Sequence, residues 1–264
     1  MGTKWVTVPS LLVQITQKDA LFGGTHTLDP YQRCSFQCRY CDSADATIEI
    51  KENAVSLLQQ ELSTLTDATI IIGSVHDPYQ PIESHQQVTR SLIKCLCNHG
   101  SIGCHILTKS SLILRDIDLL QQLKECTVTI SLSTMDPSHA LLCEPHVPPP
   151  EERLDTCTQL LSNDISTGVA LMPFLPKISE QSLPSLFSKL SSIQPSHFIY
   201  KMLELKGEEK QQFLDFINTY FPEYYQWYHQ NYCTTMLPAE NYRKEIDTII
   251  QDMCTKYTLP LRTK

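Results

Sequence analysis

The feature that most constrains the fold is a regular alternation of short apolar runs, rich in β-branched residues, with amphipathic segments. Such runs are typical of strands buried on both faces of a parallel sheet. They occupy residues 68–73, 103–108, 127–133, 166–172 and 196–202, and a weaker run covers residues 24–29. Strands that alternate with helices pair in parallel through right-handed crossovers. About six such units therefore predict an α/β fold, a partial (β/α)6 TIM-like barrel that is open on one side.

The amphipathic segments predict helices between these strands, over residues 55–65, 88–96, 117–123, 151–161 and 180–192. After about Gly207 the pattern changes to helices alone. One apolar stripe near the C-terminus consists of Tyr242, Ile246, Ile249, Ile250, Met253 and Tyr257. We therefore predict a barrel over residues 1–206 and a C-terminal helical segment, residues 207–264, that packs on it.

The composition and charge narrow the functional classes. Hydrophobic residues make up 41% of the 264 residues and charged residues 19%, as in ordinary soluble globular proteins. The net charge of −8 counts against a partner held mainly through its phosphates, which needs a concentrated basic surface. No apolar run approaches the roughly 20 residues of a membrane span, and the N-terminus lacks the pattern of a secretory signal. We expect a cytoplasmic protein with no membrane partner.

The eleven cysteines argue against a disulfide framework, because their number is odd, the chain is large and no export signal precedes them. Eight are dispersed, and we interpret them as small buried hydrophobic residues. The other three, Cys34, Cys38 and Cys41, lie within the stretch RCSFQCRYCD. This cluster is the most compact chemical signal in the sequence.

The cysteine cluster follows the first predicted strand, at the end of a parallel barrel where active sites lie. A structural zinc site would need a fourth ligand, which His26 or Asp42 would have to supply. A [4Fe–4S] cluster held by three cysteines would leave one iron open for a small molecule. The third interpretation is that the three cysteines bind no metal and are clustered in the core of the protein. The spacing by itself leaves these alternatives open.

The pattern C-x3-C-x-Tyr-C, in which Tyr40 precedes the last cysteine, resembles the signature of radical S-adenosylmethionine (SAM) enzymes. The resemblance implies a [4Fe–4S] cluster on Cys34, Cys38 and Cys41, with the open iron bound by the methionine moiety of SAM. It also implies reductive cleavage of SAM to a 5′-deoxyadenosyl radical that abstracts hydrogen from a substrate. An electron donor such as flavodoxin or ferredoxin would be a partner.

Four further phrases resemble the spore photoproduct lyase-like subgroup, often labelled DNA repair photolyase-like. They occur in the order of that subgroup, each at or just after a predicted strand: GSVHDPYQPIE, LTKSSLILRDIDLL, ISLSTMD and CEPHVPPPEERLD. The resemblance runs from about Thr27 to Pro176 and is weaker beyond. It supports the same partial barrel as the strand pattern.

The resemblance implies contacts with each end of SAM. Tyr40 would lie against the adenine, Ser74 and Asp77 would contact the amino group, and Lys109 would pair with the carboxylate.

Further contacts would lie after the fourth and fifth strands. Ser133 and Thr134 would suit the ribose hydroxyls, and the stretch from Leu171 to Pro173 would stack on the adenine. Arg153 and Glu144 would pair either with each other or with SAM.

Two departures from the lyase pattern argue against lesion repair. Ser74 stands where the lyase has a hydrogen-donating cysteine, and Asp42 stands where it has an aromatic residue. The aromatic stretch at residues 224–232 lacks the interleaved basic residues of a base-stacking surface. Nucleic acid is therefore a partner that the sequence does not favour.

Three functions remain open from the sequence. The first is a radical SAM enzyme that acts on an unidentified substrate. The second is a spore photoproduct lyase-like enzyme that acts on a DNA or nucleotide lesion. The third is a non-catalytic iron–sulfur or zinc-binding sensor.

Overall fold

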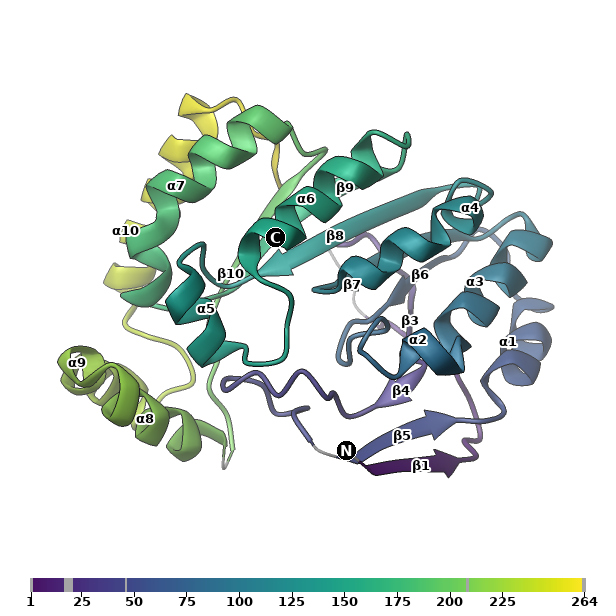
Figure 1. Ribbon diagram of the computed structural model, residues 1–264, viewed down its shortest axis with the longest axis horizontal. Helices are drawn as coiled ribbons and strands as arrows, with labels where there is room; N and C mark the ends of the chain where they lie inside the picture. The colour runs from purple at the N-terminus through teal and green to yellow at the C-terminus, as the bar shows by residue number, and fades with distance from the viewer. Residues whose placement is uncertain (1, 17–20, 46, 208, 263–264) are drawn as a thin grey trace.

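The computed structural model describes residues 2–16, 21–45, 47–207 and 209–262. Its main sheet has the strand order β11-β10-β9-β8-β7-β6-β3-β2, and all neighbours pair in parallel except β2 and β3. The edge strands β2 (Val13–Gln14) and β11 (Leu261–Arg262) do not pair with each other in the described part of the chain. The strongly curved sheet in Figure 1 is thus a partial TIM-like barrel with an open side, as the sequence predicts.

Every strand expected from an apolar run is present. They are β3 (His26–Leu28), β6 (Thr69–Ile72), β7 (Gly103–Thr108), β8 (Cys126–Leu132), β9 (Ser166–Phe174) and β10 (Phe198–Met202). Their neighbours in the sheet are also neighbours in sequence, since each strand returns through a helical connection on the outside. This arrangement brings the C-terminal ends of all six strands to one mouth.

Helices cover the outer face of the sheet (Figure 1). Those expected from the sequence are α1 (Ala54–Leu62), α3 (Val88–His99), α4 (Ile117–Leu120), α6 (Pro150–Leu161) and α7 (Ile178–Ile193). Gly100 ends α3 with φ of 73°, a left-handed cap that glycine adopts without strain. The sequence did not predict the short helices α2 (Glu83–Gln86) and α5 (Pro137–Cys143), or the 3₁₀ helix η1 (Ser111–Asp116).

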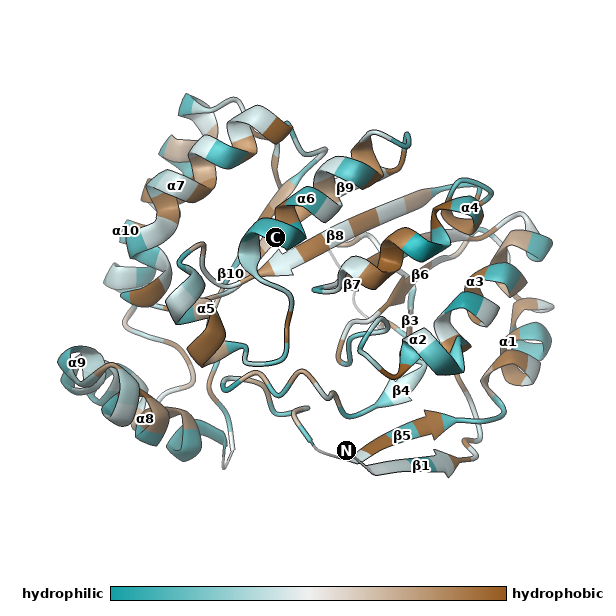
Figure 2. Cartoon of the chain, in the orientation of Figure 1, coloured by the Kyte–Doolittle hydropathy of each residue, from teal (hydrophilic) through white to brown (hydrophobic). Residues whose placement is uncertain are grey.

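Strand β8 shows how the two faces of the sheet differ. Val128, Ile130 and Leu132 belong to the main apolar core, while the alternate residues Thr129 and Ser131 make polar contacts. Figure 2 shows this alternation of colour along β8. The inside of the barrel is therefore polar at this strand, and it provides hydrogen-bonding groups rather than apolar packing.

A second, three-stranded sheet was missed by the sequence analysis. Its strands are β1 (Gly2–Val6), β5 (Thr47–Lys51) and β4 (Tyr31–Gln32), in the order β1-β5-β4. Because β4 precedes the cysteine cluster and β5 follows it, their antiparallel pairing closes the cysteine segment into a loop. This small sheet holds both ends of the loop at the barrel mouth.

The C-terminal segment contains α8 (Glu209–Tyr220), α9 (Pro222–Tyr232) and α10 (Glu240–Lys256). Figure 1 shows α8 and α9 as a hairpin beside the mouth and α10 beside α7. Tyr242, Ile246 and Ile250 of α10 join the main core, whereas α8 and α9 pack around a separate apolar cluster. The segment is not helical throughout, since its end forms β11 and extends the main sheet. The division at residue 206 remains a prediction.

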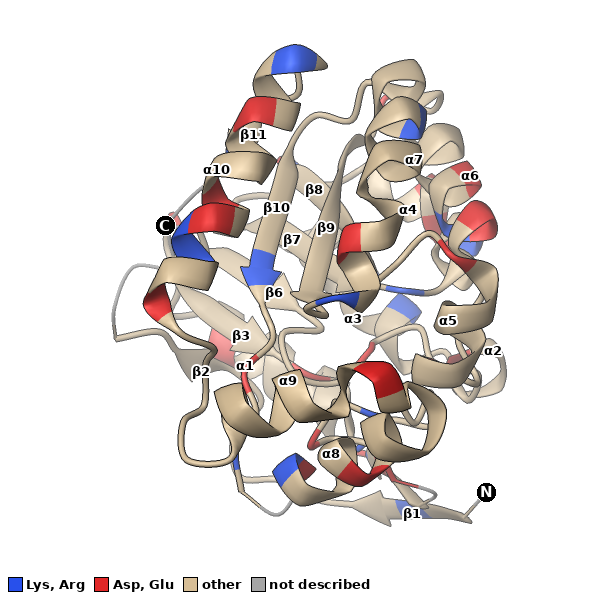
Figure 3. Ribbon diagram, turned by 90° about the vertical axis from the view of Figure 1, so that its left-hand side faces the viewer, with Lys and Arg blue, Asp and Glu red and all other residues tan. Residues whose placement is uncertain are grey.

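Within the described residues, no helix is long and apolar enough to cross a membrane. Acidic and basic residues are scattered along the elements on the side of the molecule that contains the open side of the barrel (Figure 3).

Candidate active site at the mouth of the barrel

The cysteine loop folds back on itself through backbone hydrogen bonds. The nitrogen of Cys34 donates to the carbonyl of Ser43 at 2.8 Å, and the nitrogen of Asp45 returns a bond to the carbonyl of Cys34 at 3.2 Å. The nitrogen of Cys41 donates to the carbonyl of Cys38 at 3.1 Å. These bonds gather the three cysteines on one compact loop.

All three thiols are free, and Cys34 and Cys38 are buried while Cys41 is partly exposed. The thiol of Cys38 interacts electrostatically with those of Cys34 and Cys41. Burial and the charge of Asp77 raise the pKa of Cys34 to about 11, and burial raises the pKa of Cys38 as well. These two thiols therefore keep their protons at neutral pH until metal binding displaces them.

The loop offers three free thiols as candidate ligands for a cluster with several irons. Throughout the described ranges, no group of three or more His, Cys, Asp or Glu side chains is arranged to hold a single metal ion. A [4Fe–4S] cluster instead places each thiolate on a different iron, so its ligands need not converge on one point. The donor set, three neighbouring cysteines on one loop, fits that group.

Gln80 fastens the cysteine loop to the barrel. Its side-chain oxygen accepts hydrogen bonds from the nitrogen of Ser35 at 3.0 Å and from Ser35 Oγ at 3.1 Å. Its Nε2 donates to the carbonyl of Arg33 at 3.1 Å. Gln80 is fully buried, so these bonds are shielded from water. The sequence analysis did not single out this residue, although it lies in the motif GSVHDPYQPIE.

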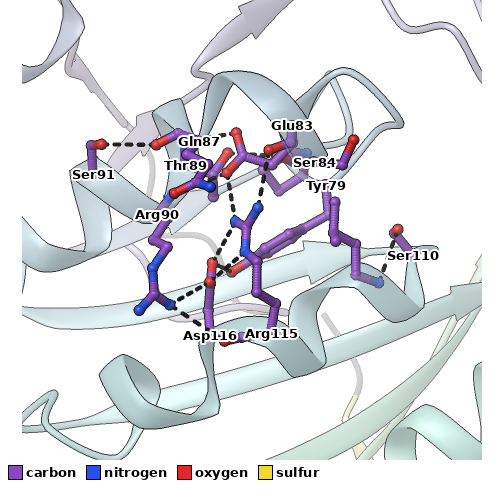
Figure 4. Close-up of polar contacts among 12 residues, drawn as sticks. Tyr79, Glu83, Ser84, Gln87, Thr89, Arg90, Ser91, Ser110, Arg115 and Asp116 are labelled. Atoms are coloured by element: carbon purple, nitrogen blue, oxygen red, sulfur yellow. Dashed lines mark hydrogen bonds and ion pairs between the residues drawn. The ribbon is translucent and has the colours of Figure 1, made fainter.

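The segment after Gln80 is anchored by a buried polar network (Figure 4). Tyr79 Oη donates to Asp116 at 3.1 Å, and Arg115 pairs with Glu83 at 2.7 Å and with Asp116 at 2.8 Å. Glu83 also accepts from the hydroxyl of Tyr31, which precedes the cysteine loop. Both carboxylates are fully buried and hydrogen-bonded, so the network holds residues 79–83 in one conformation.

Asp77 links two strand ends at the mouth. Its carboxylate accepts hydrogen bonds from Thr108 Oγ1 at 2.7 Å, the nitrogen of Lys109 at 2.7 Å and the nitrogen of Tyr79 at 2.9 Å. Burial raises the pKa of Asp77, although the three hydrogen bonds and the charge of Lys109 oppose that effect. A carboxylate has about four acceptor sites, so one remains for a ligand.

Lys109 carries a positive charge among acidic groups. Burial would lower its pKa, but Cys38, Glu144, Asp77 and Cys41 together raise the pKa of Lys109 above its usual value. In the described part of the chain, no side chain forms a hydrogen bond or ion pair with its Nζ. The ammonium group therefore remains available to a ligand in the cavity that it lines.

Tyr40 is held by a buried ion pair. Its hydroxyl donates to Glu144 Oε1, and Arg153 donates to Glu144 Oε2 at 2.5 Å. Burial would raise the pKa of Glu144, but Arg153 and Lys109 hold that pKa below its usual value. The other nitrogens of Arg153 donate to the carbonyls of Pro148 and Ser131. The structure thus pairs Glu144 with Arg153, one of the two arrangements that the sequence left open.

These residues surround a cavity of about 310 Å³ at the ends of β6, β7, β9 and β10. Its size is in the range of small-ligand sites. It brings together seven residues predicted from the sequence to contact SAM or the cluster: Tyr40, Cys41, Ser74, Asp77, Lys109, Met172 and Pro173. The cavity continues along the segment after β10, where it is lined by Lys201, Glu204, Lys206 and Glu209, none of which the sequence analysis singled out.

Three further predicted residues are buried but are not among those lining the described cavity. Ser133 Oγ is buried and has no hydrogen-bond partner among the described residues. Thr134 Oγ1 is 3.0 Å from Ser182 Oγ. Leu171 is fully buried in β9, and the residues after it, Met172 and Pro173, line the cavity instead.

Asp29 was missed by the sequence analysis. It follows β3, and its carboxylate accepts hydrogen bonds from the nitrogens of Val75 and His76 at 3.3 and 3.2 Å. Ser74 Oγ lies 3.5 Å from the same carboxylate. Its position directly after a predicted strand is the signal that could have identified it.

Comparison with known proteins identifies a matching family model and several related sequences. The family model of the radical SAM superfamily matches residues 28–190. An uncharacterized protein of Mycobacterium tuberculosis is 24% identical over 255 residues, which cover 89% of this chain and 75% of that protein. An uncharacterized protein of Methanocaldococcus jannaschii is 24% identical over 217 residues, covering 77% and 79% of the two chains.

The solved structures that resemble the fold include mutants of spore photoproduct lyase. One superposes with a TM-score of 0.71 at 12% identity and covers 99% of this chain and 82% of that one. Another, with bound AdoMet and dinucleoside spore photoproduct, has a TM-score of 0.69 at 12% identity, with 99% and 82% coverage. Streptococcus suis SuiB bound to S-adenosylmethionine has a TM-score of 0.61 at 12% identity, with 90% and 49% coverage.

Proposed function

Since the chain belongs to the radical SAM superfamily, we propose that it cleaves SAM reductively at the barrel mouth and abstracts a hydrogen atom from a bound substrate. When bound, the [4Fe–4S] cluster and SAM supply the electron and the 5′-deoxyadenosyl radical. One observation carries this proposal. The partly buried ammonium of Lys109, unpaired among the described residues, lines the cavity together with Cys41 and feels the charges of Cys38 and Cys41.

We assign the cluster to Cys34, Cys38 and Cys41, which are free and clustered on one loop. Lys109 would neutralise the carboxylate of the methionine moiety, because a charge-assisted contact is stronger in a partly buried site than in water. Asp77 would accept from the amino group at its remaining acceptor site. Ser74 is exposed at the edge of the same cavity and is a second candidate for that group.

We assign the nucleoside end to groups from the strand ends. Tyr40, fixed through Glu144, would pack against the adenine together with Met172 and Pro173. Ser133 is not among the residues that line the cavity, so it would donate to a ribose hydroxyl only if SAM binding opens the end of β8. Its buried Oγ lacks a partner among the described residues, and such groups are costly unless they are satisfied. Thr134 and Leu171 would support this end from behind. Arg153 acts as a positioning residue, since its donors are used within the protein.

Anaerobic reconstitution tests the proposal. We expect about four irons and four sulfides per chain, and dithionite-driven conversion of SAM to 5′-deoxyadenosine and methionine. Tight binding of zinc with no SAM cleavage by the iron-reconstituted protein would instead support a non-catalytic sensor. Reduced flavodoxin and ferredoxin can then replace dithionite, because a radical SAM enzyme needs a protein reductant in the cell.

A lesion lyase is the second candidate, favoured by the fold shared with spore photoproduct lyase. Ser74 lines the cavity but bears a hydroxyl, whose hydrogen is a much poorer donor to a carbon radical than that of a thiol. Asp42 lines the same cavity and adds a negative charge where a nucleotide phosphate would approach. Dinucleoside spore photoproduct is therefore expected to remain unrepaired while SAM is cleaved; repair in every turnover would establish the lyase.

A further inference from the structure

A second cavity, of about 370 Å³, lies between the end of β10 and α10. It shares Lys201, Met202 and Glu204 with the cavity at the barrel mouth, so the two cavities meet at the end of β10. Figure 3 shows this face, with a basic segment on β10 and both basic and acidic segments on α10. Nothing in the proposed SAM site uses the remaining residues of the second cavity.

The acidic residues of the second cavity already have partners. Asp247 accepts a hydrogen bond from Tyr200 Oη at 2.6 Å. Glu204 pairs with Lys201 at 3.4 Å and with Lys206 at 3.1 Å. Lysines therefore compensate the charge of Glu204, whereas Asp247 has a neutral partner. Among the described residues, neither carboxylate forms an ion pair with an arginine of the cavity.

Neither of the two arginines of the second cavity has an acidic partner among the described residues. Arg243 donates through Nε to the carbonyl of Pro238 at 3.1 Å, which orients its guanidinium. Arg262 lies on β11 beside Ile199. Within the described residues, neither forms an ion pair. Four of the other five arginines pair with carboxylates, namely Arg33, Arg90, Arg115 and Arg153, whereas no ion pair of Arg39 is found among the described residues.

We propose that the second cavity binds an anionic group of the substrate, a carboxylate or a phosphate, through Arg243 and Arg262. This inference rests on the proposed function, because the meeting point of the cavities at Lys201 and Met202 would place the rest of the substrate next to SAM. Guanidinium groups match the planar fork of a carboxylate and the oxygens of a phosphate. The net charge of −8 does not favour anions overall, so the attraction must be local. Arg243, Arg262 and Lys201 line the cavity and outnumber its two carboxylates, Glu204 and Asp247.

The test measures anion binding to the full-length, cluster-loaded protein, with inorganic phosphate in one arm and acetate in the other. We expect saturable binding of at least one anion by calorimetry and a matching rise in melting temperature, since a ligand of the native state stabilises it. Binding of phosphate alone indicates a phosphorylated substrate, and binding of acetate alone indicates a carboxylate. No saturable binding of either anion by the wild type would overturn the proposal.

Variants identify the residues. Arg243→Gln with Arg262→Gln should weaken anion binding at least tenfold, and each single variant should weaken it less. The matched control is Lys244→Gln with Lys256→Gln, which removes two charges from exposed positions of the same helix. Equal binding by the arginine variant and its control would contradict the proposal. If the double variant does not fold, Arg262→Gln alone provides the test.

SAM cleavage is scored separately on the wild type and on the lysine control. Anion binding needs no turnover. A protein that binds the anion through these arginines but does not cleave SAM would therefore overturn the proposed function and still support the anion site. A protein that cleaves SAM without binding either anion would overturn the anion site and support the proposed function.

Discussion

The side-chain oxygen of Gln80 accepts hydrogen bonds from both the backbone nitrogen and Oγ of Ser35, the residue that follows the first cysteine of the loop. Since Gln80 also donates to the carbonyl of Arg33, one buried side chain clamps the backbone on both sides of Cys34. The backbone geometry at Cys34, which we propose as a cluster ligand, therefore depends on a residue 45 positions after Ser35.

Gln80→Leu removes its three hydrogen bonds to the loop and a fourth to the carbonyl of Asp77. It leaves buried polar groups of the loop unsatisfied, at about 1–3 kcal/mol for each group. We expect faster loss of iron to a chelator and a lower melting temperature, both measured on the reconstituted protein. Gln60→Leu, at an exposed position of α1, is the control. Unchanged iron retention in Gln80→Leu would show that the clamp does not support the cluster.

Cys34→Ala should abolish stable cluster binding and leave the barrel folded. Cys34 packs in a small apolar cluster with Phe36 and Cys38, apart from the main core, so its truncation removes little of the packing that holds the sheet. Iron content and the visible spectrum report the cluster, and circular dichroism reports the fold. Cys233→Ala, at an exposed cysteine, should retain normal iron. A Cys34→Ala protein that still cleaved SAM would refute the ligand assignment.

Lys109→Met should weaken SAM binding by about tenfold to a hundredfold, the range for a hydrogen bond to a charged group. The ammonium group of Lys109 lines the cavity and has no ion-pair partner among the described residues, so its loss leaves the SAM carboxylate uncompensated. Equilibrium binding of SAM to the reconstituted protein measures the effect. Lys189→Met removes a half-exposed surface lysine and should bind SAM normally; equal affinity in both variants would rule out the proposed contact.

Arg153→Met should lower the free energy of unfolding by about 3–5 kcal/mol, because it leaves the carboxylate of Glu144 buried without its partner. Both side chains of this pair are almost completely buried, at 1% and 0% exposure. Lys244→Met breaks an exposed pair with Glu240 and should cost less than about 1 kcal/mol. Urea unfolding measures both values, and similar costs for the two variants would contradict the structural role of the buried pair.

His197 should make the protein less stable in acid. Its buried ring shares a hydrogen bond with Thr129 Oγ1, which lies 2.7 Å from His197 Nε2. Burial, together with the charges of Arg262 and His105, lowers the pKa of His197 to about 3. An unfolded histidine has a pKa of about 6.5. Below that pH the unfolded chain binds a proton that the folded chain does not, so this contribution is complete above about pH 6.5 and is lost as the pH falls.

The expected loss is up to about 1.4 kcal/mol for each pH unit between about pH 6 and pH 3.5. Urea unfolding at several pH values should therefore show that the free energy of unfolding falls less steeply in acid for His197→Asn than for the wild type. His85→Asn, on the surface of α2, serves as the control. The same pH dependence of the free energy of unfolding in the wild type and in His197→Asn would mean that this histidine does not couple folding to pH.

The elements that the sequence predicted are those whose hydrophobic pattern repeats over several residues. Strand β7 begins and ends where predicted, because its run from Gly103 to Thr108 is apolar and bounded by turn residues. Strands β4 and β11 have two residues each, too few for any periodicity. They form because a neighbouring strand offers hydrogen bonds, which is information that a local pattern does not contain.

The candidate site likewise has features that the sequence predicted and features that only the tertiary structure showed. The spacing of Cys34, Cys38 and Cys41, together with Tyr40, determined the family resemblance and the cofactors, because these residues lie close together in the chain. Only the tertiary structure decided that Glu144 pairs with Arg153 and holds Tyr40, a contact between residues 104 positions apart. It also placed Gln80 against the loop, and it placed two arginines that are unpaired among the described residues in one cavity. Charges and hydrogen bonds act through space, so their partners are fixed only when the sheet brings distant strand ends together.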